Sequence, residues 1–150
     1  EGARNVVWPA RMQRLKDGPL TALAPDQEIW LDGGHNPHAA RAIARQLNNM
    51  PGRTALVAAM LASKDATGYF MPFRQVRPEV FTLPNAPGHQ GAEPQALAEA
   101  ATNAGLKAAA YDSLEAALKA AATTGVDRIL ICGSLYLAGE VLAQNGEPPA

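Results

Sequence analysis

Polar residues capable of chemistry stand directly after three short apolar segments. Asp32 and His35 lie in Asp-Gly-Gly-His-Asn-Pro, Lys64 lies in Ser-Lys-Asp, and Ser134 lies in Cys-Gly-Ser. A carboxylate accepts hydrogen bonds from hydroxyls, imidazole exchanges protons, an ammonium binds anions, and a serine at a helix start faces anionic ligands. If the apolar segments are parallel strands, their carboxyl ends form one edge of a sheet, where ligands bind. We therefore expect these four side chains to gather there.

Each of these positions also has a purely structural explanation. Asn36 is a good helix N-cap and Pro37 a good first helical residue. Lys64 fits a solvated charge, and Ser134 fits an N-cap worth ~1 kcal/mol to its helix. Cys132, within an apolar run, fits a small buried hydrophobic residue.

Several familiar site motifs are absent. The sequence has no G-x-x-x-x-G-K-[ST] phosphate loop, no G-x-G-x-x-G segment and no His/Cys cluster at zinc spacing. Its three histidines match no metal-binding pattern, so we predict no metal held by this chain alone. A Ser-His-Asp triad could be drawn from Ser134, His35 and Asp32, but no G-x-S-x-G elbow supports it.

The elements that must position these residues alternate along the chain. Short apolar strands alternate with Ala-rich helical segments, which predicts one α/β domain over 1–150 with a mostly parallel sheet and helices on both faces. The expected strands are 28–32, 54–61, 80–83, 108–111 and 128–132. The expected helices are 37–50, 94–104, 113–123 and one after Ser134, with a weakly helical stretch 66–76 interrupted by Pro72.

Finer features of the chain are also predicted. We expect 5–15 to be extended because of Pro9, and 16–27 to be a loop. Asp112-Ser-Leu-Glu115 resembles a capping box with Asp112 as the cap. The tail 145–150 should fray.

Composition excludes several classes of function. With 150 residues the chain fits one domain, and its net charge of −1 argues against nucleic-acid or membrane-surface partners. A single cysteine allows no disulfide within the chain, so a reducing cytoplasm is expected. No apolar run approaches the ~20 residues of a membrane span. The chain begins at Glu1 without methionine, so we expect it to come from a longer protein.

Four segments together resemble a known family. They are Trp8-Pro-Ala-Arg11, Leu31-Asp-Gly-Gly-His-Asn-Pro-His-Ala-Ala40, Ala62-Ser-Lys-Asp65 and Cys132-Gly-Ser-Leu-Tyr-Leu-Ala-Gly-Glu-Val-Leu142. In this order they resemble motifs of the C-terminal domain of folylpolyglutamate synthases, in the Mur ligase family. Two departures stand out: Gly34 replaces a common Ala, which we expect to be mild, and the spacing from Arg11 to Asp32 is long.

The resemblance implies a Rossmann-like domain and an ATP-dependent folate:L-glutamate ligase. An N-terminal P-loop ATPase domain of the same polypeptide would share the active site and supply most of the ligands of Mg²⁺. ATP would phosphorylate a carboxylate of folate or dihydropteroate, and the amine of L-glutamate would displace the phosphate. The parent enzyme would be cytoplasmic, and this chain alone would be inactive.

Residue roles follow from the same resemblance. It assigns Arg11 to ATP phosphate, Asp32 to the ribose hydroxyls, and Ser134 with the helix after it to the incoming glutamate. It places His35 near the reacting groups and ATP, and Lys64 as a further contact in the catalytic set. Tyr136 is assigned to packing.

Two other functions stay open at this stage. The chain could be the same domain of another Mur-type amino-acid ligase, such as a peptidoglycan precursor enzyme, although the Gly-His-Asn-Pro-His wording favours the folate branch. It could also be a non-catalytic nucleotide-binding α/β module.

Overall fold

The computed structural model describes residues 11–147, which form one six-stranded sheet in the order β1-β2-β6-β3-β4-β5. Neighbouring strands run parallel, except that β1 pairs antiparallel with β2. The strands are β1 Gln13–Arg14, β2 Glu28–Asp32, β3 Thr54–Ala58, β4 Glu79–Thr82, β5 Ala108–Ala110 and β6 Arg128–Cys132. The α/β prediction is confirmed.

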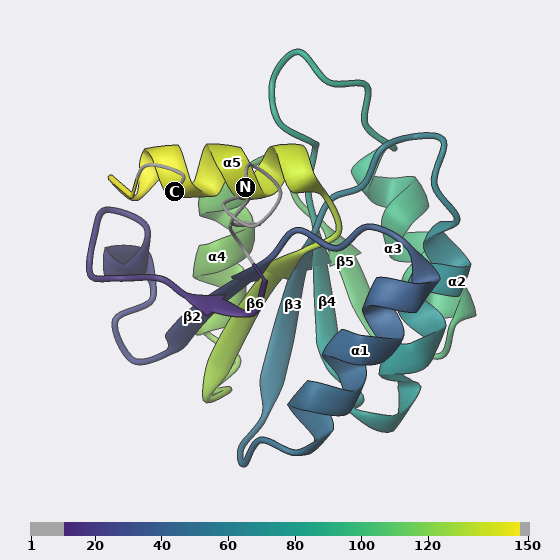
Figure 1. The fold of residues 1–150 in the computed structure, drawn as a ribbon, viewed down its shortest axis with the longest axis horizontal. Coiled ribbons are helices and arrows are strands. Elements are labelled where there is room, and N and C mark those ends of the chain that lie inside the picture. Colours follow the sequence, from purple (N-terminus) through teal and green to yellow (C-terminus); the bar gives the residue numbers. More distant parts are fainter. Residues whose placement is uncertain (1–10, 148–150) are drawn as a thin grey trace, which may run out of the picture.

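Helices cover both faces of this sheet (Figure 1). They are α1 Pro37–Asn48, α2 Ala66–Phe70, α3 Pro94–Asn103, α4 Leu114–Ala122 and α5 Leu135–Gln144, with short 3-10 turns η1 Thr21–Leu23 and η2 Met71–Gln75. α4 and α5 pack on one face, and α1, α2, η2 and α3 pack on the other. Because alternate strand residues point to opposite faces, Ile129 and Ile131 join the first core, whereas Leu130 and Cys132 join the second.

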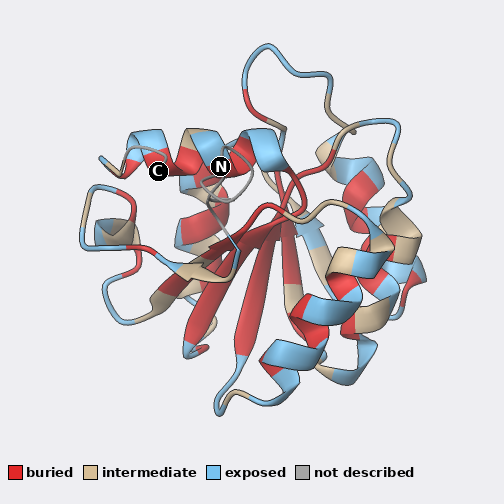
Figure 2. Cartoon of the chain, in the orientation of Figure 1, coloured by how far each residue is buried: buried red, intermediate tan, exposed pale blue. Residues whose placement is uncertain are grey.

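The two central strands are buried along their whole length, as Figure 2 shows. This agrees with the continuous apolar character of β3 and β6, which is typical of parallel strands covered on both sides. β3 ends at Ala58, three residues earlier than predicted, and the chain then turns away at the carboxyl edge.

Most helix starts match the sequence, with one correction. The Asn36 side chain caps α1 by accepting from the Ala39 N–H at 2.8 Å. At α4 the cap is Ser113, which accepts from the Ala116 N–H at 3.1 Å, so the prediction of Asp112 was wrong. The helix begins one residue later than expected, which leaves Glu115 too early for a capping box.

The predictions for the two ends of the chain can be compared with the structure only in part. Of the expected extended segment 5–15, Gln13–Arg14 form β1, and 5–10 lie outside the described residues. The prediction was wrong at Met12, whose φ of 44° is left-handed rather than extended. We expected the tail to fray from residue 145 onward, and this prediction is wrong for Asn145 itself, because Asn145 is buried. Its Oδ1 accepts from the Leu20 N–H at 3.0 Å, and its Nδ2 donates to the Lys16 carbonyl at 2.8 Å.

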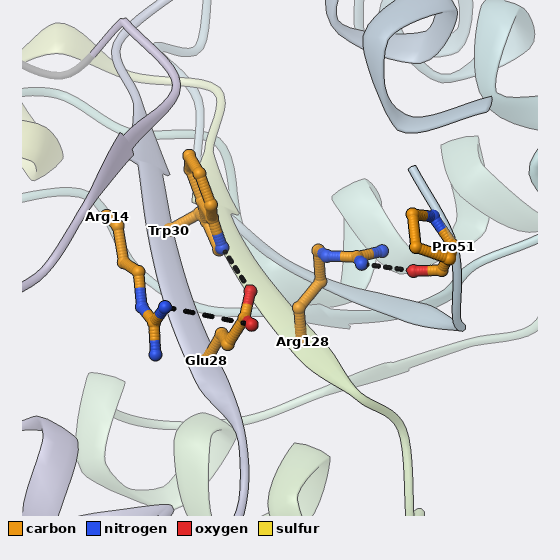
Figure 3. Close-up of polar contacts among 5 residues, drawn as sticks. All are labelled: Arg14, Glu28, Trp30, Pro51 and Arg128. Atoms are coloured by element: carbon orange, nitrogen blue, oxygen red, sulfur yellow. Dashed lines mark hydrogen bonds and ion pairs between the residues drawn. The ribbon is translucent and has the colours of Figure 1, made fainter. Parts of the chain in front are cut away.

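Polar contacts secure the amino-terminal ends of β2 and β6 (Figure 3). Trp30 Nε1 donates to Glu28 at 3.0 Å, and Arg14 pairs with the same carboxylate at 3.7 Å. The guanidinium of Arg128 donates to the Pro51 carbonyl and, at 2.9 Å, to Thr54 Oγ1. Among residues 11–147, no helix has the length and apolar character needed to cross a membrane.

Candidate functional site

The candidate site lies where two neighbouring strands send their chains to opposite faces of the sheet. β2 and β6 are paired in register, Asp32 beside Cys132. After β2 the chain enters α1 on one face, and after β6 it enters α5 on the other. Such a switch point opens a crevice beyond the carboxyl ends of the strands, which is where open α/β sheets bind ligands.

A cavity of about 380 Å³ occupies this crevice. Arg11, Asp32 and His35 all line it, so the structure brings together three of the five residues singled out in the sequence. The remaining wall comes from the β2–α1 turn, one face of α1 and the start of α5, through Met12, Gly33, Gly34, Asn36, Ala39, Ala42, Ile43, Gln46 and Leu135.

Asp32 is held rigidly at the base of this cavity. Its Oδ1 accepts from the Gly34 N–H at 2.8 Å and its Oδ2 from the Met12 N–H at 3.0 Å. Met12 has a φ of 44°, a left-handed backbone conformation unusual for a side chain of this kind. The hydrogen bond to the Asp32 carboxylate thus holds Met12 in this conformation, and Arg11 is the residue directly before it.

Burial dominates the electrostatics of this carboxyl group. Only 8% of Asp32 is exposed, and the loss of water raises its pKa above the ordinary value of 3.8. The two N–H bonds and the nearby Arg11 guanidinium lower the pKa, and so oppose this effect only in part. A polar hydroxyl placed against Asp32 would replace part of the missing hydration.

The packing around Gly34 leaves little room for a side chain. A Cβ at this position would lie 2.6 Å from the Ala39 Cβ and 3.0 Å from Asp32 Oδ1. In this chain an alanine at position 34 would therefore require a neighbouring atom to move.

His35 and Arg11 extend the site outward from Asp32. His35 is half-buried, with Nδ1 3.4 Å from the Gly33 carbonyl oxygen, and it directly precedes the capped start of α1. Arg11 is exposed at the rim. A cation and a helix N-terminus together make this end of the cavity suited to an anion.

Ser134 lies at the same edge of the sheet, but its hydroxyl does not line the cavity. Its side chain is buried, with the residue only 2% exposed, and its Oγ donates to Asn85 Oδ1 at 2.7 Å. The same oxygen caps α5 by accepting from the Leu137 N–H at 3.1 Å. The neighbouring Leu135 reaches the cavity instead.

Asn85 is a polar residue that the sequence analysis missed. Its Oδ1 also accepts from the Ala86 N–H at 2.9 Å, which fixes the orientation of the amide, and its buried Nδ2 has no partner among the described residues. The available signal was its place just after β4 in a loop rich in proline and glycine.

Lys64 stands apart from the cavity. It lies between β3 and α2, half-buried, and its N–H donates to the Leu61 carbonyl at 3.2 Å. β3 is separated from β2 by β6, so Lys64 shares the edge of the sheet with Asp32 without sharing the cavity.

Two aromatic rings meet above the start of α5. The rings of His89 and Tyr136 stack with centroids 3.7 Å apart and planes 15° from parallel. Tyr136 is 44% exposed, so its packing is with this loop residue at the surface rather than in a core. The stack and the bond from Ser134 to Asn85 both tie the loop after β4 to α5.

The described residues supply no complete metal site. Nowhere in the described part of the chain do three His, Cys, Asp or Glu side chains gather as a ligand set. Cys132 is fully buried, and burial raises the pKa of its thiol to about 12, so it is a poor metal ligand and nucleophile. A Mg²⁺ ion would need ligands from outside the described residues.

Comparisons with known proteins agree with this architecture. The chain is 33% identical to the folylpolyglutamate synthase of Lacticaseibacillus casei over 136 residues, covering 89% of this chain and 29% of that relative. A structure of Mycobacterium tuberculosis folylpolyglutamate synthase with ADP and AMPPCP shares its fold, with a TM-score of 0.81 and 23% identity over 97% of this chain and 34% of the other.

A second solved structure is somewhat nearer in sequence. It is a bifunctional folylpolyglutamate synthase/dihydrofolate synthase with Mn, AMPPNP and L-glutamate bound, 26% identical, with a TM-score of 0.70 over 93% of this chain and 32% of that one. The family model for the glutamate ligase domain of Mur ligases matches residues 10–135. The chain therefore belongs to the family of Mur ligase glutamate ligase domains.

Proposed function

We propose that this chain is the C-terminal domain of an ATP-dependent folate:L-glutamate ligase. The observation that carries the proposal is the convergence of Arg11, Asp32 and His35 on one crevice at the switch point of the sheet. Support comes from the family and from the similarity to folylpolyglutamate synthases, one of which binds AMPPNP, Mn and L-glutamate.

The shape of the crevice suits a nucleotide lying along α1. The buried carboxylate of Asp32 keeps lone pairs beyond those used by Gly34 and Met12, and these can accept from ribose hydroxyls. The phosphates then extend toward Arg11 and the start of α1, where cationic and N–H groups favour negative charge.

The purine base of the nucleotide would lie toward the other end of α1. Ala42 and Ile43 present small and apolar surface to a flat ring, and Gln46 lies about one helical turn (~5.4 Å) beyond Ala42. The amide of Gln46 offers both a donor and an acceptor to the edge of the base. In this proposal the phosphates lie at one end of the crevice and the purine at the other.

The incoming L-glutamate is assigned to the start of α5, beside Ser134. Because the Ser134 hydroxyl is already committed to Asn85 and Leu137, its contribution is to hold the first turn of the helix in place. The N-terminus of α5 then faces a carboxylate of the amino acid. Ser134 acts in this proposal through the backbone it caps.

The chemistry proposed is amide-bond formation through an acyl phosphate, a mixed anhydride of the carboxylate and phosphate. A carboxylate oxygen of folate or dihydropteroate attacks the γ-phosphorus of ATP, and ADP leaves. The amine of glutamate then attacks the acyl carbon, phosphate departs with the bonding electrons, and the amine loses a proton. Mg²⁺ would neutralise phosphate charge. His35 and Lys64 lie at the edge where these groups meet, and we assign them contacts to the reacting groups.

The ligase would need a partner domain from the same polypeptide. An N-terminal P-loop domain would supply the phosphate cradle and most Mg²⁺ ligands, and the cleft between the domains would hold the reaction. This chain alone should be inactive and should bind ATP weakly. The parent enzyme is proposed to act in the cytoplasm.

The test is glutamate-dependent ATP hydrolysis by the chain joined to its P-loop domain, with a reduced folate or dihydropteroate as acceptor. Arg11→Ala should lower the rate at least ~10²-fold, because a guanidinium on phosphate contributes a few kcal/mol in the transition state. Arg14→Ala is the matched control, since Arg14 is exposed and pairs with Glu28. Equal rates for both variants would contradict the site.

The choice of acceptor tests the substrate class separately. Activity with a peptidoglycan precursor and none with a folate or dihydropteroate would identify another Mur-type ligase. Tight ATP binding by the chain alone would favour the non-catalytic nucleotide-binding module.

A further inference from the structure

A second and larger cavity opens at the opposite edge of the sheet. It has a volume of about 1090 Å³ and lies at the amino-terminal ends of β3, β4 and β5, beside η2 and the end of α3. We call it the basal groove, and its charged lining residues are Arg53, Arg74, Arg77, Lys107 and Glu79. The candidate nucleotide crevice shares none of these residues.

The charges of the basal groove are unbalanced. Its four basic residues are accompanied by two acidic ones, Glu79 and the nearby Asp127. The Glu79 carboxylate lies 3.9 Å from Lys107 Nζ, and the Asp127 carboxylate accepts from the Arg53 N–H at 2.7 Å. Four cations and two acids leave a charge of +2 here. The remaining nine basic and twelve acidic residues of the chain then sum to −3. Positive charge is thus concentrated at one edge of a nearly neutral chain.

The guanidinium groups around the groove remain available to a ligand. Arg53, Arg74 and Arg77 are exposed and form no ion pair with any described residue. The end of α3 nearby carries the negative end of the helix dipole, which favours cations and accounts for part of the clustering. It does not account for four cations, and the Lys107 side chain is 82% exposed.

A buried cation lies directly behind the wall of the groove. Arg128 is 5% exposed, and its side chain extends toward Pro51, as Figure 3 shows. It donates to Thr54, which lines the groove, yet no carboxylate among the described residues pairs with it and its Nε has no partner. A buried charge without a counter-charge is costly, and an anion in the groove would reduce that cost.

Arg77, which lines the groove, has a strained backbone conformation. Its φ is +54°, where glycine is the usual residue, and its N–H closes η2 by donating to the Phe73 carbonyl at 2.9 Å. Pro78 follows, which further restricts the backbone of Arg77. Strain at an exposed arginine, where glycine would fit better, points to a role for the side chain.

We propose that the basal groove binds a small polyanion carrying several phosphate or carboxylate groups. Guanidinium groups suit both, because their donors pair with two oxyanion oxygens at once. The groove lies across the sheet from the crevice, so this ligand would bind independently of the substrates proposed above.

The experiment follows backbone amide signals of the ¹⁵N-labelled 150-residue chain during titration with inorganic triphosphate, and in a parallel series with citrate. Signals of Arg53, Arg77 and Lys107 should shift, and resolved signals separate them from Gly34 and His35 in the crevice. Binding should weaken as ionic strength rises, because the cations are exposed. The tighter of the two anions assigns the preferred group.

Two substitutions and one control make the test specific. Arg77→Gly should weaken triphosphate binding about three- to tenfold, and Lys107→Gln somewhat less, as expected for partly exposed charged contacts. Lys16→Gln removes the same charge outside the groove and should leave the affinity unchanged. Arg77→Gly should also unfold at an equal or higher temperature, because glycine relieves the strained φ.

The outcomes divide cleanly. Groove-localised shifts that both groove variants weaken and Lys16→Gln spares support the proposal. Shifts confined to Gly34 and His35, shifts nowhere at millimolar anion, or equal weakening by Lys16→Gln overturn it. A loss of binding by Arg77→Gly accompanied by a lower unfolding temperature would attribute the arginine to folding, and Lys107→Gln would then decide.

Discussion

Gly34→Ala tests how tightly the turn after β2 is built. The added methyl would lie 2.6 Å from the Ala39 Cβ, 3.0 Å from Asp32 Oδ1 and 3.6 Å from Ile43 Cδ1. Both close neighbours are fixed, since Ala39 belongs to the capped first turn of α1 and the carboxylate holds two N–H groups. Overpacking of this kind costs about 1–3 kcal/mol.

The unfolded state offsets part of that cost. Alanine restricts the unfolded chain and contributes about 0.4–1 kcal/mol of stability. We therefore expect the free energy of unfolding in urea to fall by about 1–2 kcal/mol, following these two effects. If the proposed nucleotide site is correct, displacement of Asp32 in the full-length protein should also weaken ATP binding.

Gly139→Ala is the matched control. Gly139 lies inside α5, and a Cβ there meets nothing within 4 Å. The same chemical change should therefore raise stability by about 0.5–1 kcal/mol through helix propensity. If Gly34→Ala were as stable as the parent chain, with unchanged amide signals for Asp32 and Met12, the tight packing deduced for this turn would be refuted.

Two further predictions concern β6 and the helix after it. Ser134→Ala should lower the free energy of unfolding by about 1–2 kcal/mol, more than the exposed cap change Ser113→Ala, because it also removes the buried bond to Asn85; equal losses in urea would contradict this. For Cys132, burial raises the thiol pKa from 9.0 to about 12, so the native state resists ionisation that the unfolded state undergoes above pH 9. The stability from this group is complete below pH 9 and falls as pH rises toward 12, by about 1.4 kcal/mol between pH 8 and 10. In Cys132→Ala this fall in the free energy of unfolding should be absent, whereas any pH dependence that comes from Tyr69 should remain in both chains. If the two chains showed the same pH dependence of stability, the thiol would be less buried than described.

The sequence predicted the elements well where the signal was local. The apolar runs at 54–61 and 128–132 indicated the strands β3 and β6, and Asn36-Pro37 located the start of α1. Pro72 marked the change from α2 to η2. These features depend on residues within a few positions of each other, so a single sequence carries them.

Features that depend on distant contacts were not predictable. The order of strands arises from how the connections cross the sheet, and no local pattern records it. Burial of Ser134 depends on the loop at Asn85, 49 residues earlier, and the order at Asn145 depends on contacts with Lys16 and Leu20. Alternation therefore predicted that Asp32 and Ser134 share an edge, but not which side chain faces the crevice.

Nucleotide discrimination by Asp32 tests the central claim most directly. In the full-length protein, proposed above to be a ligase, the affinities for ATP and 2′,3′-dideoxy-ATP are measured by calorimetry for the parent chain and for Asp32→Ala. If Asp32 accepts from the ribose hydroxyls, the parent should prefer ATP about ten- to a hundredfold, as expected for hydrogen bonds to a charged group, and the variant should lose that preference. A variant that binds both nucleotides with the parent's ratio of affinities would contradict the placement of the ribose in this crevice.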